Sequence, residues 1–100
     1  MHELDTIFSP YSLAVIGASA TPGKVGHDIF KNILRGEYTG ILYPVNPGAE
    51  SVLSVKAYPS VLDIPGQVDM AMIILPPKFA LEAVGQAIEK GVKVIVIVSA

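Results

Sequence analysis

Unbroken apolar runs alternate along this chain with segments in which apolar residues recur every three or four positions. A run that is apolar on successive residues is typical of a parallel β-strand covered on both faces. The longer spacing is typical of an amphipathic helix. The pattern predicts strands at Leu13–Gly17, Ile41–Val45, Met70–Leu75 and Val92–Val98. A shorter run at Val55–Tyr58 predicts one more strand, inside an irregular link.

Two segments have the spacing of a helix. The first runs from Val25 to Arg35, and its apolar face consists of Val25, Ile29, Phe30, Ile33 and Leu34. Gly36 follows it, where a helix end favours a left-handed residue. The second segment begins at Pro77 and ends before Gly91, which suits the first position and the end of a helix. Its apolar face consists of Phe79, Ala80, Ala83, Val84, Ala87 and Ile88.

This order of elements predicts an α/β fold, a Rossmann-like parallel sheet of about five strands with helices on both faces. The first strand is expected in the centre, between the second and the fourth. Ligands of such sheets bind beyond the carboxyl ends of the strands, beside the first one. Three segments should therefore surround one crevice, with Val45–Gly48 on its flank: Gly17–Gly26, Leu75–Lys78 and Val98–Ala100.

The stretch Ser12–Gly26 joins the first strand to the first helix through a loop of small and hydroxyl residues. Gly17 ends the apolar run, and the loop also contains Ser19, Gly23 and Lys24. Glycine lets the backbone come close to an anion, and the free N–H groups and dipole of a helix's first turn favour negative charge. The loop is therefore a candidate site for the phosphates of a ligand.

Two common nucleotide motifs are not met. The dinucleotide motif G-x-G-x-x-G fails because Ser19 stands two residues after Gly17, and the second strand ends in Asn46-Pro47 rather than in an acidic residue. Both departures argue against an NAD site. The Walker motif is nearer, but Val25 replaces the hydroxyl that binds magnesium. A metal-dependent nucleoside triphosphatase is therefore disfavoured.

Composition narrows the possible classes of protein and of binding partner further. The chain has 100 residues, of which 51% are hydrophobic and 16% charged, which predicts a single globular domain. The net charge of −2 and the scattered basic residues argue against nucleic-acid binding. The longest apolar runs are too short to cross a membrane, so no membrane partner is expected. The chain contains no cysteine, which excludes disulfides and favours the cytoplasm.

Short motifs follow one another along nearly the whole chain. They are Ile7-Phe8-Ser9-Pro10, Val15-Ile16-Gly17-Ala18-Ser19, Gly23-Lys24-Val25-Gly26, Tyr43-Pro44-Val45-Asn46-Pro47, Tyr58-Pro59-Ser60-Val61, Val68-Asp69-Met70-Ala71, Gly91-Val92-Lys93 and Ser99-Ala100. Together they resemble the N-terminal CoA-binding domain of the nucleoside-diphosphate-forming acyl-CoA synthetases. That family includes the ADP-forming acetate–CoA ligases and is related to the succinyl-CoA synthetase alpha subunit.

The resemblance implies that residues 1–100 form a Rossmann-like domain at the start of a longer enzyme. Such an enzyme makes acyl-CoA, ADP and phosphate from an acid, CoA and ATP, or runs the reverse reaction. CoA or acyl-CoA is the implied ligand, with its pyrophosphate on the glycine loop and its remainder along the ends of neighbouring strands. The implied binding residues are Ser19, Gly23, Lys24, Val25, Gly26, Val45, Asn46, Pro47, Leu75, Pro76 and Ser99.

The resemblance also implies that the rest of the reaction occurs elsewhere. ATP, ADP and Mg²⁺ are expected only in other domains or in a partner subunit, and so is the family's phosphorylated histidine. The two histidines here are His2, in the lead-in, and His27, which we interpret as a solvated helical residue. Neither suits that role. No catalytic residue and no metal site are predicted, and this chain alone should form no acyl-CoA.

One segment departs from the family pattern. The loop after Asn46-Pro47 reads Gly48-Ala49-Glu50, whereas such proteins often carry a lysine there. Contact with the 3′-phosphate of CoA therefore lacks its usual candidate, and Lys56 is the substitute.

Two other functions stay open at this point: a stand-alone CoA-binding protein, and the regulatory domain of a fused protein acetyltransferase. A homo-oligomer is expected, because part of Val92–Val98 would keep an exposed apolar face. Replacing Gly26 by valine is expected to preserve the fold and to weaken CoA binding at least about tenfold, because a side chain would crowd the pyrophosphate or the facing strand.

Overall fold

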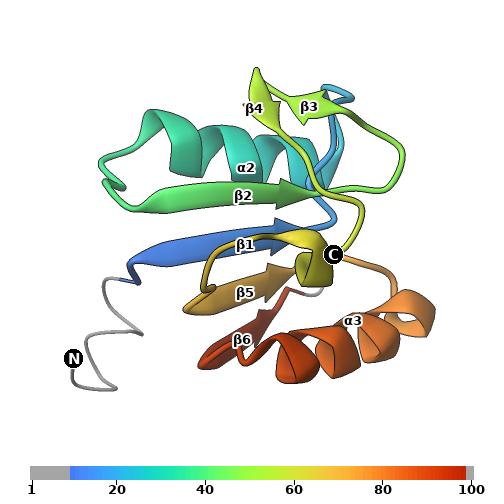
Figure 1. The fold of residues 1–100 in the computed structure, drawn as a ribbon. Coiled ribbons are helices and arrows are strands. Elements are labelled where there is room, and N and C mark those ends of the chain that lie inside the picture. Colours follow the sequence, from blue (N-terminus) through green and yellow to red (C-terminus); the bar gives the residue numbers. More distant parts are fainter. Residues whose placement is uncertain (1–9, 99–100) are drawn as a thin grey trace.

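The computed structural model describes residues 10–98, and a parallel sheet forms the centre of the molecule (Figure 1). Its four strands are β1 (Ser12–Ile16), β2 (Ile41–Val45), β5 (Met70–Ile73) and β6 (Val94–Ile97), in the order β2-β1-β5-β6. β1 pairs in parallel with both β2 and β5, as predicted for the central strand. The remaining elements are α2 (Val25–Arg35), β3 (Ser51–Val52), β4 (Val55–Lys56), η1 (Val61–Asp63) and α3 (Pro77–Lys90).

The prediction of about five strands in the sheet was slightly too high. Residues Val55 and Lys56 pair with β3 in a small antiparallel hairpin, and Tyr58 makes a single bridge to Val45. The Pro44 carbonyl accepts the Tyr58 N–H at 3.0 Å, so the backbone of Pro44 faces the outer edge of β2. Proline has no N–H to offer there, and the ladder does not extend beyond this bridge.

The two long helices cover opposite faces of the sheet. Leu13 and Val15 of β1 belong to the core that contains Phe30 of α2. Their neighbours Ala14 and Ile16 belong to the core that contains Ala80, Ala83 and Ala87 of α3. Successive side chains of a strand point to opposite faces, so β1 is covered on both sides. This explains why its sequence is apolar without alternation.

The buried face of α3 is narrower than predicted. Ala80, Ala83 and Ala87 are buried, but Phe79 and Ile88 are 49% and 66% exposed. The short alanines face the sheet, whereas both larger residues lie on neighbouring faces of the helix. Among residues 10–98, no helix is both long and apolar enough to cross a bilayer.

Polar groups close the amino end of the sheet. The buried carboxylate of Asp69 accepts the Tyr11 N–H at 2.9 Å and lies 3.8 Å from the ammonium of Lys93. The Tyr38 hydroxyl donates to the Pro10 carbonyl at 2.9 Å, and burial together with the Asp69 carboxylate raises the pKa of Tyr38. Each of these side chains therefore has a polar partner within residues 10–98.

Candidate functional site

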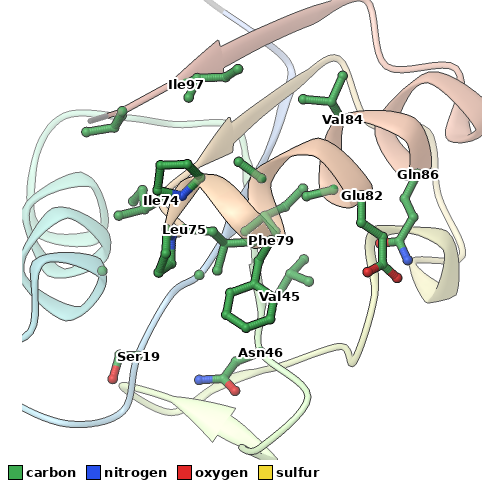
Figure 2. Close-up of a pocket in the computed structure, with 18 of the residues that line it drawn as sticks. Ser19, Val45, Asn46, Ile74, Leu75, Phe79, Glu82, Val84, Gln86 and Ile97 are labelled. Atoms are coloured by element: carbon green, nitrogen blue, oxygen red, sulfur yellow. The ribbon is translucent and has the colours of Figure 1, made fainter. Parts of the chain in front are cut away.

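A cleft of about 1040 Å³ opens at the carboxyl end of the sheet (Figure 2). The loop after β1, residues 45–47 after β2, residues 74–77 after β5, the first turns of α3 and the end of β6 contribute to its walls. This is the position predicted for the crevice beside the first strand.

Gly17 allows the loop to leave β1 directly beside β5. Its φ of +101° belongs to the left-handed region that favours glycine. A methyl group here would lie 2.9 Å from the Ile74 carbonyl carbon and would overlap the carbonyl oxygen. The same junction contains a hydrogen bond of 2.7 Å from the Ile74 N–H to the Ile16 carbonyl. The floor of the cleft is therefore formed where the backbones of Gly17 and Ile74 lie in close contact.

Gly26 brings the first turn of α2 against the end of β1. A methyl group at Gly26 would overlap the Gly17 carbonyl oxygen and lie 3.0 Å from its carbon. The structure thus corrects the expectation that Gly26→Val leaves the fold intact. Of the two reasons considered for this glycine, crowding of the facing strand is the one that the structure supports directly, because the contact is between backbones.

Asn46 connects this loop to the segment after β2. Its Nδ2 donates to the Ala18 carbonyl at 2.8 Å, and its Oδ1 accepts the Gly48 N–H at 2.8 Å. The Gly17 N–H also donates to the Val45 carbonyl at 3.0 Å. Both polar ends of the Asn46 side chain are engaged inside the fold, so its contribution to the cleft is to fix the two loops together.

His27 is buried, contrary to its interpretation as a solvated residue. It is 6% exposed, and its Nδ1 lies 2.9 Å from the Ser19 carbonyl oxygen. The sequence contained a signal that was overlooked: His27 precedes the buried Phe30 by three residues, and residues at that spacing share a helix face.

The N-terminus of α2 faces the cleft without a side-chain cap. Lys24 is its N-cap residue and makes no capping hydrogen bond, and Lys24, Val25 and Gly26 all line the cleft. The N–H groups of Val25 and Gly26 precede His27, whose N–H is the first to donate to the Lys24 carbonyl, so they have no acceptor within the helix and stay available to a ligand. Together with the helix dipole and the Lys24 ammonium, they favour an anion at this end of the cleft.

Most of the residues expected at the site do line this cleft. They are Ser19, Lys24, Val25, Gly26, Val45, Asn46, Pro47, Leu75 and Pro76. Gly23 is not in the lining but shapes the loop through its φ of +92°. Lys56 is not in the lining either, and its ammonium lies 5.4 Å from the centre of the Tyr58 ring. Ser99 lies outside the described residues.

The sequence reasoning missed the contribution of α3. Larger side chains of this helix line the cleft, namely Phe79, Leu81, Glu82, Val84 and Gln86. Figure 2 shows Phe79, Glu82, Val84 and Gln86 among them. Phe79 was assigned to the buried face, but it stands half exposed at the cleft. The available signal was the spacing of Phe79, Glu82 and Gln86, because residues three and four positions apart share one face of a helix that starts at the crevice.

The cleft combines few charged groups with many apolar ones. Its charged lining residues, within the part of the chain that the structure describes, are Lys24 and Glu82. No group of three His, Cys, Asp or Glu side chains that could hold a metal occurs among residues 10–98. The cleft thus combines an anion-binding end with a long, mainly apolar wall.

Known proteins share both the sequence and the fold. The alpha subunit of ADP-forming acetate–CoA ligase II from Pyrococcus furiosus is 50% identical over 97 residues, which is 97% of this chain and 21% of that one. The dinucleotide-forming acetyl-coenzyme A synthetase 1 of Candidatus Korarchaeum cryptofilum, solved with phosphate and ADP, is 37% identical, with a TM-score of 0.94 over all of this chain and 22% of that one. A hypothetical protein from Pyrococcus horikoshii is 38% identical, with a TM-score of 0.81 over 95% of this chain and 68% of that one.

These matches agree with the resemblance predicted from the motifs. The chain spans only about a fifth of the ligase and synthetase chains named above. The model of the CoA binding domain family matches residues 11–100, nearly the whole chain. The chain therefore belongs to the CoA-binding domain family.

Proposed function

We propose that this chain is the CoA-binding domain of an ADP-forming acyl-CoA synthetase. The observation that carries the proposal is the cleft at the carboxyl end of β1, where a glycine loop and an uncapped helix N-terminus meet in a member of the CoA-binding family. An anion-binding end beside an apolar wall matches the chemistry of CoA, which has a pyrophosphate, a nucleotide and a long pantetheine arm.

In this proposal the pyrophosphate lies at the loop Ser19–Gly26, on the N–H groups of the first helical turn and beside Lys24. The pantetheine arm then runs along residues 45–47 and past Leu75 and Pro76, where the lining is apolar and half-exposed Phe79 adds aromatic surface. Ser99, which lies outside the described residues, is kept as a proposed contact.

The remaining chemistry is assigned to other parts of the enzyme. Acid activation by ATP needs a phosphoryl acceptor and a Mg²⁺–nucleotide site, and we place both in further domains or in a partner subunit. The chain matches only about a fifth of a ligase alpha subunit, which supports this division. The role of this chain is then to hold CoA while other domains deliver the acyl phosphate.

A stand-alone CoA-binding protein is the second candidate. The hypothetical protein from Pyrococcus horikoshii favours it, because this chain covers 68% of that much shorter molecule. The mass of the natural gene product separates the two candidates: a protein with several further domains supports the synthetase, and one only slightly longer than this chain supports the stand-alone module.

The chain is expected to bind CoA at least about tenfold more tightly than NAD, a difference of about 1.4 kcal/mol. β2 is followed by Asn46-Pro47, so the position at which dinucleotide sites carry an acidic residue for the ribose has no carboxylate, and the Asn46 amide is already engaged. Calorimetric titration of the purified chain with each ligand measures the preference. Tighter binding of NAD would reject the CoA assignment.

A pair of lysine variants tests where CoA binds. Lys24→Met removes the ammonium at the anion-binding end and is expected to weaken CoA binding about tenfold or more, since a charge-assisted hydrogen bond contributes roughly 1.5–3 kcal/mol. Lys31→Met in the same helix changes the net charge equally but lies outside the cleft lining, so its affinity for CoA should stay within about twofold. Equal losses in both variants would place the phosphates elsewhere.

Self-association of the chain is a further part of the proposal. Val96 and Ile97 of β6 are 37% and 58% exposed, and β6 has a neighbour on only one side among the described strands. An apolar strand at a sheet edge favours association with another surface. Sedimentation velocity over a range of concentrations should show dimers or larger species, and a monomer at the highest concentration would contradict this.

A further inference from the structure

We propose that His27 is a positioning residue for the anion-binding loop. Its imidazole holds the Ser19 carbonyl towards α2, so that the loop presents N–H groups rather than a carbonyl oxygen to the phosphates of CoA. This role rests on the proposed function, because it concerns the same cleft.

The hydrogen bond to Ser19 requires a proton on Nδ1 of His27. His27 is 6% exposed, and its Nδ1 lies 2.9 Å from the carbonyl oxygen of Ser19. A carbonyl oxygen only accepts hydrogen bonds, so Nδ1 carries the proton. The ring therefore acts as a donor from the first turn of α2 to the loop that precedes it, across eight residues of sequence.

Holding one side of a peptide group orients its other side. The peptide that follows Ser19 is planar and trans, so its C=O and the N–H of Ala20 point in opposite directions. Because the buried ring of His27 holds the Ser19 carbonyl towards α2, the Ala20 N–H points away from α2. Ala20 itself is exposed. An oriented N–H of this kind attracts an anion, whereas a carbonyl in its place would repel it.

The preceding peptide is held in a similar way. Asn46 donates to the Ala18 carbonyl at 2.8 Å, so two successive carbonyls of the loop are bound by side chains from different elements. The loop is thus fixed before a ligand arrives, and binding does not have to order it. His27 supplies one of these two hydrogen bonds, the one donated from α2.

Two substitutions distinguish the effect of the hydrogen bond on CoA binding from the effect of the size of the ring. His27→Phe keeps a ring of similar size without a donor, and His27→Asn keeps an amide donor close to the position of Nδ1. We expect His27→Phe to weaken CoA binding at least fivefold, and His27→Asn to stay within twofold of the unaltered chain. Pantetheine, which lacks the pyrophosphate, should bind all three proteins equally.

A second measurement does not depend on the variants. Nitrogen-15 NMR of the unaltered chain should show the His27 proton on Nδ1, and it tests the hydrogen bond even if His27→Phe fails to fold. A proton on Nε2 alone would overturn the proposal, as would equal CoA affinity in a folded His27→Phe variant or a matching loss for pantetheine. If the unaltered chain binds no CoA, the proposed function fails and this role with it, a result distinct from a defect limited to His27→Phe.

Discussion

Gly26→Ala is expected to destabilise the domain by about 3 kcal/mol or more and to weaken CoA binding at least about 100-fold. The added methyl group would overlap the Gly17 carbonyl oxygen and lie 3.0 Å from its carbon, so the end of β1 or the start of α2 must move. The gain of up to about 1 kcal/mol in helix propensity is too small to compensate. Either movement would also reshape the anion-binding loop.

Gly85→Ala is the matched control, because Gly85 also lies within a helix. A methyl group at Gly85 would have no atom within 4 Å. The variant should therefore be about 0.5–1 kcal/mol more stable than the unaltered chain, as expected for alanine in a helix. Urea unfolding of both variants measures the difference. If Gly26→Ala unfolds at the same urea concentration as Gly85→Ala, the backbone contact does not limit this position.

Gly17→Ala is expected to have the second large effect, again about 3 kcal/mol or more of lost stability. Two penalties add at this position. A left-handed conformation costs a non-glycine residue roughly 1–2 kcal/mol, and the φ of Gly17 is +101°. In addition, the methyl group would overlap the Ile74 carbonyl oxygen and push β5 away from the end of β1.

Gly91→Ala isolates the first of these penalties. Gly91 ends α3 with a φ of +89°, but a methyl group there would have no atom within 4 Å. This variant should lose only about 1–2 kcal/mol, and its CoA affinity should stay unchanged because Gly91 is not in the cleft lining. Urea unfolding gives the comparison. Equal losses at Gly17 and Gly91 would show that conformation alone, without the contact with β5, explains the effect.

The fold was predictable because its strongest signals are local. A central parallel strand is covered on both faces, so β1 is apolar throughout, and the helices have regular spacing. The number of strands in the sheet depended instead on the strand beside which a fifth one would pair. Val55–Tyr58 has a strand-like sequence, but Pro44 of β2 offers no N–H at the edge where it would pair.

The position of the cleft was predictable because it depends on the backbone. The glycine loop and the segments that follow β2 and β5 meet at one edge because parallel strands end there together. The roles of single side chains were less accessible. Phe79 was assigned by periodicity, and His27 was interpreted as a solvated polar residue of the helix. Neither argument says that a loop carbonyl lies near His27 or that an open cleft lies near Phe79.

The close contact between Gly26 and Gly17 has a thermodynamic consequence for the whole domain. It joins the anion-binding loop to β1, an inner strand that pairs with a neighbour on both sides. A loop attached in this way does not open by itself; it opens together with the core, as part of the same cooperative unit. Ligand bound to the loop therefore protects the centre of the sheet, and CoA at about 100 times its dissociation constant would add roughly 2.7 kcal/mol to the free energy of unfolding. The same linkage would slow amide hydrogen exchange throughout β1, including at Leu13 and Ala14, which do not line the cleft.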